Sequence, residues 1–262
     1  MASMVPFCRE IRRSILRASR ASGQGHIPTS FSVIEMLCAV YDTMKHDPSN
    51  PKWPERDIFI LSKGHAALGF FAGLAGYGYF KVEELNTFGG FQSHLGCHAD
   101  RFKVPGVEAS TGSLGHGIAL AVGMALAFRL QNSPRRVYTL VGDGEANEGS
   151  VWESVMVATN LRLNNLTFLL DYNKSQVRSL PIPNLAERFA AFGCDTIEVD
   201  GHNLEALKEA LAKPFGNAPK AVIAHTTKGY GSTTLMNNMF EWHRKSPNQE
   251  FFDKFMAELE AA

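Results

Sequence analysis

Two polar side chains, Asp143 and Asn173, are the residues of this chain best suited to holding a metal ion. Each follows an apolar run, and glycines flank Asp143 on both sides. One carboxylate and one amide oxygen suit a hard cation such as Mg²⁺, which completes its octahedron with water and phosphate oxygens. Flanking glycines let the backbone approach such phosphates closely. The pattern therefore predicts a site for a diphosphate and a metal ion.

Two commoner phosphate motifs are excluded by the residues present. A Walker loop ends in Gly-Lys-Ser/Thr, and the chain has no Gly-Lys pair. A dinucleotide-binding loop needs a third glycine, but Asn147 stands three positions after Gly144. The plain alternative is an ordinary Asp-Gly turn after a strand. The second motif, Asp171-Tyr172-Asn173, favours the metal site over that alternative.

A segment with helical spacing of its apolar residues, 148–161, separates the two runs. Two adjacent parallel strands joined by a helix would bring Asp143 and Asn173 to the carboxyl edge of a sheet, where ligands of such sheets bind. Helices are predicted first, and then strand and helix alternate. The predicted helices are 7–20, 31–45, 65–80, 83–88 and 113–131, followed by strands 136–141, 166–171, 195–199 and 220–226, helices 148–161, 185–192 and 203–213 between them, and a last amphipathic helix around 251–259. This order predicts an α/β fold, a parallel sheet covered by helices on both faces, in one domain over residues 1–262.

Composition narrows the possible partners and compartments. A chain of 262 residues that is 45% hydrophobic can bury the core of one such domain. Acidic and basic residues number 26 each, so no broad basic field favours nucleic acid, and no apolar run reaches the length of a membrane span. The cysteines lack metal-binding spacing and indicate free thiols in a reducing cytoplasm. They are Cys8, Cys38, Cys97 and Cys194.

Further motifs occur in a fixed order, and together they resemble the N-terminal, diphosphate-binding part of transketolase. They are Gly25-His26, Leu61-Ser62-Lys63-Gly64-His65, Thr111-Gly112-Ser113-Leu114-Gly115, Gly142-Asp143-Gly144, Asp171-Tyr172-Asn173-Lys174 and Lys228-Gly229-Tyr230-Gly231. The chain ends where that family's second, pyrimidine-binding domain would begin. It therefore resembles the N-terminal subunit of a split transketolase.

The resemblance implies a thiamine diphosphate-binding fold and a set of site residues. Thiamine diphosphate would be held with Mg²⁺, or with Ca²⁺ or Mn²⁺, and the implied metal ligands are Asp143, Asn173 and the backbone carbonyl of Ser175. The implied cofactor contacts are His65, Gly112, Leu114, Gly144, Glu148, Val177 and His243. The implied catalytic residues, which would face the oxygens of a sugar, are His26, His98 and His243. For Glu148 the resemblance implies a link between two active sites, and an acid favoured by the helix dipole is the plainer, compatible interpretation.

The implied reaction is transfer of a two-carbon ketol unit from a ketose, or a ketose phosphate, to an aldose. The glutamate that activates the cofactor in this family lies in the second domain, so the resemblance implies an α₂β₂ heterotetramer with a separate C-terminal subunit. Two other thiamine enzymes are alternatives, a deoxyxylulose phosphate synthase and a 2-oxo acid dehydrogenase subunit. The length of 262 residues disfavours the synthase, and the histidine set disfavours the dehydrogenase. A non-catalytic regulatory paralogue is the remaining alternative.

Two departures from the family's pattern concern the substrate rather than the cofactor. The chain has Val177-Arg178-Ser179 where an Ile-Asp-Gly turn is usual, and Arg244 replaces a small residue after the late histidine. Solvated surface arginines are the expected interpretation. Contact with an anionic group on the substrate is the alternative, because guanidinium matches phosphate, carboxylate or sulfonate geometry.

Overall fold

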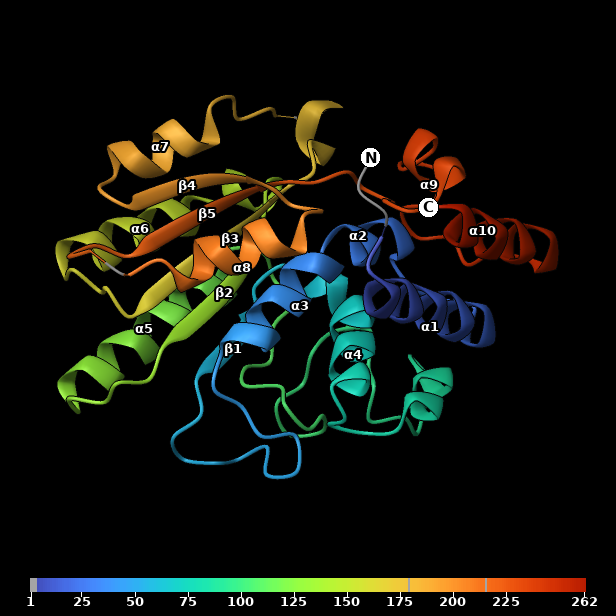
Figure 1. The fold of residues 1–262 in the computed structure, drawn as a ribbon, viewed down its shortest axis with the longest axis horizontal. Helices are drawn as coiled ribbons and strands as arrows, with labels where there is room; N and C mark the ends of the chain where they lie inside the picture. Colours follow the sequence, from blue (N-terminus) through green and yellow to red (C-terminus); the bar gives the residue numbers. More distant parts are fainter. Residues whose placement is uncertain (1–3, 179, 215) are drawn as a thin grey trace.

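A computed structural model, which describes residues 4–178, 180–214 and 216–262, folds around a parallel five-stranded sheet (Figure 1). The strand order is β1-β2-β3-β5-β4, and every neighbouring pair is parallel. The strands are β1 (Ile58–Leu61), β2 (Val137–Gly142), β3 (Leu166–Tyr172), β4 (Asp195–Asp200) and β5 (Lys220–His225). The three inner strands are almost wholly buried, as expected for a sheet with helices on both faces.

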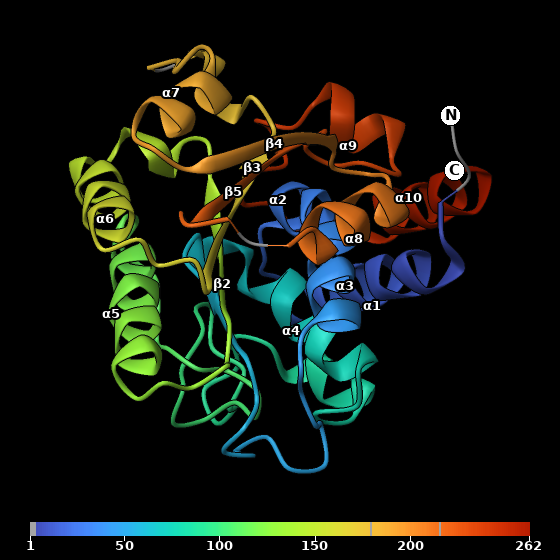
Figure 2. The same ribbon diagram turned by 60° about the vertical axis from the view of Figure 1, so that its left-hand side comes forward.

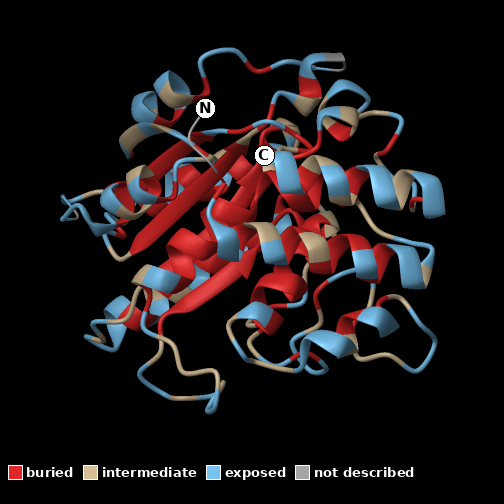
Figure 3. Cartoon of the chain, turned by 45° about the vertical axis from the view of Figure 1, so that its right-hand side comes forward, coloured by how far each residue is buried: buried red, intermediate tan, exposed pale blue. Residues whose placement is uncertain are grey.

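Two layers of helices cover the sheet, and alternate strand residues point into one layer or the other. The first layer consists of α5 (His116–Leu130), α6 (Gly149–Asn160) and α7 (Leu185–Ala191). The opposite layer consists of α1 (Pro6–Ser22), α2 (Ile27–Ser32), α3 (Ile34–Thr43), α4 (Ala67–Gly76), α8 (Leu204–Ala212) and α10 (Gln249–Ala261). Ile58 and Ile60 of β1 pack with the first layer, and Phe59 and Leu61 pack with the second, which is the period of two of a strand. Figure 2 shows the two layers, and Figure 3 shows the buried sheet between their exposed outer faces. The predicted fold class is confirmed.

The remaining elements are short. They are α9 (Thr233–Asn237) and the 3₁₀ turns η1 (Gly64–Ala66), η2 (Val82–Thr87), η3 (Glu145–Asn147) and η4 (Ser175–Arg178). In the part of the chain that the structure describes, no helix is long and apolar enough to cross a membrane.

The structure differs from the predicted elements in four places. Strand β1 was not predicted, because an apolar run of four residues does not reveal its period. The helix predicted over 31–45 is two helices, α2 and α3, since the chain turns at Val33 (φ −100°, ψ 0°). Helix α9 was not predicted, and the helix predicted over 65–80 ends at Gly76. The other predicted helices and strands are present with bounds shifted by a few residues.

The strand register brings several loops to one edge of the sheet. Gly142 of β2 pairs with Asp171 of β3, so the residues that follow both strands begin at the same height. Tyr172 of β3 pairs with His225 of β5, which adds the loop that begins at Thr226. Leu61 of β1 pairs with Leu140, so the motif from Ser62 to His65 starts two residues lower along the same edge. The carboxyl edge of the sheet therefore collects the motifs that the sequence singled out.

Candidate active site

A cavity of about 410 Å³ opens at this carboxyl edge. It is lined by nine of the predicted site residues: His26, His65, His98, Gly112, Leu114, Asp143, Gly144, Ser175 and His243. Six further residues line it, namely Lys63, Gly142, Glu145, Gln176, Lys228 and Arg244. Of these six, Lys63, Glu145, Gln176 and Lys228 were not predicted as site residues. The lining as a whole comes from the loops after β1, β2, β3 and β5, from the glycine turn before α5, from the segments that hold His26 and His98, and from the segment after α9.

Asp143 presents a carboxylate oxygen with no protein partner. Its Oδ1 accepts hydrogen bonds from the Gly144 amide (2.7 Å) and the Ser175 hydroxyl (3.0 Å), while its buried Oδ2 has no donor among the described residues. Burial, and then the charge of Asp171, raises the pKa of this carboxyl. Leaving a buried carboxylate oxygen unpaired is costly, and a cation bound there would satisfy it.

At this corner of the cavity, the amide of Asn173 is linked to Asp143 through Ser175, although Asn173 itself is not among the residues that line the cavity. Its Nδ2 donates to Asp171 (2.8 Å), and its Oδ1 accepts from the Ser175 amide (3.0 Å) with a second lone pair to spare. Among the described residues no three His, Cys, Asp or Glu side chains gather as a metal cluster. An aspartate and an asparagine leave most positions of an octahedral ion to outside oxygens, so the donor set fits Mg²⁺ held together with a diphosphate.

Asp171 is fully buried behind this corner and joins three loops. It accepts hydrogen bonds from Ser32 (2.8 Å) and Asn173, contacts Thr226, and forms an ion pair with Lys63. Burial alone would raise the pKa of Asp171, but the charge of Lys63 lowers it below its ordinary value. The pair fixes the loops after β1, β3 and β5 relative to one another, and it thereby orients the Asn173 amide.

Glu145 performs a similar task for the glycine turn before α5. Its carboxylate accepts hydrogen bonds from the Ser62 hydroxyl (2.6 Å) and from the amides of Gly115 (2.8 Å) and Gly142 (3.1 Å). Gly115 has φ 79°, a conformation that favours glycine. A Cβ on Gly64 would lie 2.7 Å from the Gly112 Cα, so the turn touches the backbone after β1. This packing holds Leu114 at the cavity wall.

Three histidines face one another across the cavity. The ring of His26 lies 5.1 Å from that of His243 and 5.7 Å from that of His65, centroid to centroid. Burial and the neighbouring His243 lower the pKa of His26 to about 4. Burial and Lys63 lower that of His65 to about 2, and burial and Lys228 lower that of His243 to about 4. All three rings are therefore neutral at pH 7, and a neutral ring has one nitrogen that donates and one that accepts a hydrogen bond. The fourth histidine, His98, is exposed at the rim.

Lys228 is held beside His243 by a buried network. Its Nζ lies 3.3 Å from the His243 Nδ1, and burial followed by the charge of Lys63 lowers its pKa to about 8. The next residues anchor the loop: the Gly229 amide donates to the Pro28 carbonyl (2.9 Å), and the Tyr230 ring stacks on His202 at 3.6 Å. His202 in turn contacts Glu35, which forms a buried ion pair with Arg12.

Two predicted cofactor contacts are not among the residues that line the cavity. Glu148 is exposed at the N-terminus of α6, and Val177 is 60% exposed on η4. Their roles stay predictions. The side chain of Arg178 and all of Ser179 lie outside the described residues, whereas Arg244 lines the cavity.

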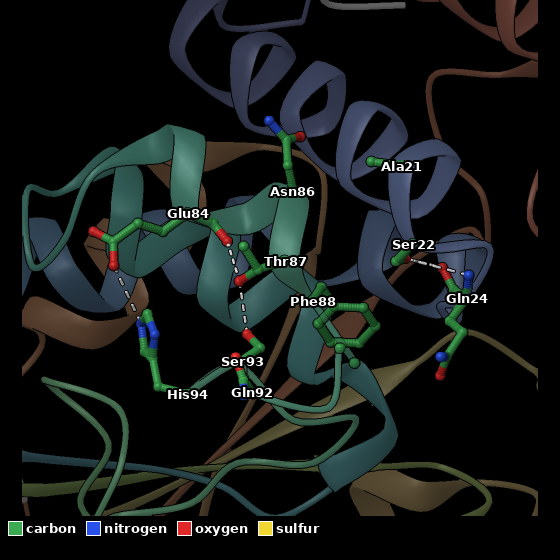
Figure 4. Close-up of a pocket in the computed structure, with 12 residues that line it drawn as sticks. Ala21, Ser22, Gln24, Glu84, Asn86, Thr87, Phe88, Gln92, Ser93 and His94 are labelled. Atoms are coloured by element: carbon green, nitrogen blue, oxygen red, sulfur yellow. Dashed lines mark hydrogen bonds and ion pairs between the residues drawn. The ribbon is translucent and has the colours of Figure 1, made fainter.

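Larger hollows elsewhere lack this chemistry. One of about 730 Å³ lies between the loops 49–56 and 101–108, near the start of β1 and thus at the opposite end of that strand. Another of about 560 Å³ lies between α1, η2 and the loop 88–94 (Figure 4). Its polar side chains pair with each other, as Glu84 does with His94 (3.6 Å) and Thr87 with Ser93 (2.7 Å). These contacts brace the loop that leads to His98.

Comparison with known protein families agrees with the class of protein that the fold and the site indicate. Residues 7–246 match the family described as "Transketolase, thiamine diphosphate binding domain". The chain belongs to this family.

Relatives and solved structures agree with this assignment. The chain is 38% identical to a 6-deoxy-6-sulfo-D-fructose transketolase subunit of a Clostridium species, over 95% of this chain and 94% of the relative. It is also 38% identical to an apulose-4-phosphate transketolase subunit of Actinobacillus succinogenes, over 96% and 94%. The transketolase structure from Leishmania mexicana superposes with a TM-score of 0.91 at 29% identity, over 99% of this chain but 42% of that one. The chain thus spans about two fifths of the solved transketolases it matches.

Proposed function

We propose that this chain is the diphosphate-binding subunit of a two-subunit transketolase, which moves a two-carbon ketol unit from an anionic ketose to an aldose. The observation that carries the proposal is the unpaired Oδ2 of Asp143, a residue that lines a cavity walled by neutral histidines and is linked through Ser175 to the Asn173 amide. Two relatives of nearly equal length support the reaction class, since their names describe transketolase subunits for a sulfonated and a phosphorylated sugar. We further propose that residues 1–262 form one domain and that the cytoplasm, where thiols stay reduced, is its compartment.

The metal corner and the glycine turn would hold the cofactor. Asp143, Asn173 and the carbonyl of Ser175 would ligate a divalent cation, with Mg²⁺ proposed first and Ca²⁺ or Mn²⁺ as substitutes. Gly144 and His65 would contact the diphosphate, and Leu114 and Gly112 would form the wall against the ring system, with Val177 at the edge. When bound, thiamine diphosphate supplies the electron sink for cleavage of a carbon–carbon bond beside a carbonyl.

The histidines would handle the protons of the sugar. Cleavage beside a hydroxyl needs a base for that hydroxyl, and a neutral His26 can accept its proton at pH 7. A protonated Lys228 donates toward the Nδ1 of His243, so the Nε2 of that ring would carry the hydrogen and act as a donor. His98, at the rim, would form a hydrogen bond with the oxygen at the other end of the two-carbon unit.

A second subunit would complete the site. The residues that line the cavity offer no glutamate free to activate the cofactor, because Glu145 already accepts three hydrogen bonds. We propose that a C-terminal, pyrimidine-binding subunit supplies it in an α₂β₂ heterotetramer. Support comes from large apolar side chains exposed on the outer faces of α5 and α6, which are typical of association surfaces. They are Leu120, Leu130, Met156 and Val157. Glu148, exposed at the N-terminus of α6, would lie near the contact between subunits.

Calorimetry and a transfer assay together test the proposal. The chain is mixed with its C-terminal partner and titrated with thiamine diphosphate in Mg²⁺ or in EDTA. We expect Mg²⁺-dependent binding and ketol transfer from a ketose phosphate by the mixture, and no transfer by the isolated chain. Asp143→Ala and Asn173→Ala should each abolish the Mg²⁺-dependent binding. Wild-type binding by both variants, or full transfer by the chain alone, would overturn the proposal.

A further inference from the structure

Among the described residues that line the cavity, Arg244 is a cation without a pairing partner in the protein. It follows His243 directly, is exposed, and has no hydrogen bond or ion pair within the described ranges 4–178, 180–214 and 216–262. The other two cationic side chains of the lining have partners: Lys63 forms an ion pair with Asp171, and Lys228 contacts His243. An arginine that is free at the wall of a cavity is available to a ligand.

The carboxylates of the lining do not neutralise it. Glu145 is buried and accepts three hydrogen bonds from other groups. Asp143 is buried with one oxygen bound to Gly144 and Ser175, and its free oxygen is the one we assign to a cation. A guanidinium left over after these pairings attracts an anion from solution, and its planar fork matches three-oxygen groups such as phosphate or sulfonate.

The position of Arg244 along the cavity separates it from the metal corner. Arg244 directly follows His243, whose ring lies 5.1 Å from that of His26. Lys63 is instead paired with Asp171, which also accepts a hydrogen bond from the Asn173 amide next to the metal corner. The cavity therefore has a metal end, with Asp143 and Lys63, and a histidine end, with His26, His243 and Arg244. A ketose whose hydroxyl contacts His26 would have its remaining carbon atoms at the histidine end, near Arg244.

We propose that Arg244 is a specificity-determining residue that binds the anionic group, phosphate or sulfonate, on the distal carbon of the ketose. The inference rests on the proposed function and deepens it, because it assigns substrate charge selection to this chain. A residue that only stabilised the fold would not distinguish a charged sugar from its neutral counterpart.

The test compares charged and neutral sugars in the holo complex with its C-terminal partner. The ratio of kcat/KM for D-xylulose 5-phosphate to that for D-xylulose is measured for wild type, Arg244→Ala and Arg244→Lys. Lys245→Ala is the matched control, because Lys245 is the adjacent exposed cation, pairs with Glu241 (2.8 Å) and does not line the cavity. We expect Arg244→Ala to lower the ratio by about tenfold or more, which is the scale of a hydrogen bond to a charged group. Arg244→Lys should restore part of the ratio, and Lys245→Ala should leave it unchanged.

Equilibrium binding separates this inference from the proposed function. The affinities of ribose 5-phosphate and ribose are measured by calorimetry with the same variants, without a ketose donor, together with that of thiamine diphosphate. An unchanged phosphate preference in Arg244→Ala overturns the inference, and so does a loss of cofactor affinity with no change in that preference. If the wild-type complex transfers no ketol unit, the proposed function fails, and the binding measurement alone decides the role of Arg244.

Discussion

Asp171 illustrates how a residue that does not line the cavity can determine the site. It is fully buried and carries four contacts, of which the ion pair with Lys63 is the only charged one among the described residues. Replacing a buried pair as a whole is often tolerated, whereas removal of one partner leaves the other charge uncompensated. The Asn173 amide depends on the same carboxylate, so stability and metal binding are coupled at this residue.

Asp171→Asn should therefore lower the free energy of unfolding by about 3–5 kcal/mol, because the Lys63 ammonium stays buried without its partner. Lys63→Met alone should cost less, since Asp171 keeps its neutral donors Ser32 and Asn173. The double variant should be more stable than the sum of the single losses predicts, by about 0.5–3 kcal/mol. Urea denaturation of the four proteins measures this coupling. Strictly additive losses would show that the pair does not act as a unit.

The depressed pKa of His26 predicts an unusual acid limit for activity. A base works only while it is neutral, and burial, with His243 and Arg244, moves the pKa of His26 from 6.5 to about 4. In the complex, kcat/KM should stay constant as the pH falls through 6.5 and should decline only as it approaches 4. The measurement is the pH profile of kcat/KM in buffers of constant ionic strength. If kcat/KM instead falls near pH 6.5, and this fall is absent in His26→Asn, the lowered pKa of His26 is contradicted. His26 would then still be the base.

The turn before α5 is the element whose geometry the site depends on most directly. Gly115 has φ 79°, its amide donates to Glu145, and a Cβ there would lie 2.9 Å from the Glu148 Cβ. Gly115→Ala should cost about 1–3 kcal/mol of unfolding free energy, since an alanine resists this backbone conformation. Displacement of Leu114 should also weaken thiamine diphosphate binding in the complex.

Gly123 offers the matched control within the same helix. A Cβ at Gly123 meets nothing within 4 Å, so Gly123→Ala should stabilise α5 by up to about 1 kcal/mol. Thermal unfolding of both variants and calorimetry with the cofactor make the comparison. Equal behaviour of the two alanines would mean that the turn conformation does not constrain the site.

At the element scale the sequence predicts most of the fold and misses what depends on distant partners. Long segments with clear periodicity, such as α1 and α6, were predicted within two residues of their ends. Strand β1 was missed because its four residues carry too little pattern, although its pairing with β2 positions Ser62 and Lys63. Lys63 and Asp171 are 108 residues apart, so local pattern gives no sign of their ion pair. The one local sign that Asp171 matters is that it is a charged residue near the end of an apolar strand.

At the scale of the whole molecule, the two layers of helices differ in how they meet solvent. Helices α5 and α6 pack on each other and on the sheet, and α5 is apolar on its outer face as well as its inner one. A helix that is apolar all round is expected inside a protein or an assembly rather than at a free surface. This asymmetry is the structural basis for proposing that the layer of α5 and α6 faces another subunit.

Leu120→Glu tests that surface without touching the cavity. Leu120 is 44% exposed, so a glutamate there should change the free energy of unfolding of the isolated chain by no more than about 0.5 kcal/mol. In an assembly, the same carboxylate would be buried against apolar atoms, and association should weaken by about tenfold or more because a buried unpaired charge is costly. Val82→Glu is the control: Val82 is 41% exposed on η2, which packs on α1 and α4 on the opposite side of the sheet. Sedimentation velocity of each variant with the C-terminal partner gives the mass of the complex as a function of concentration. If Leu120→Glu assembles like the wild type while Val82→Glu does not, the contact lies on the α1 side, and the apolar outer face of α5 has another cause.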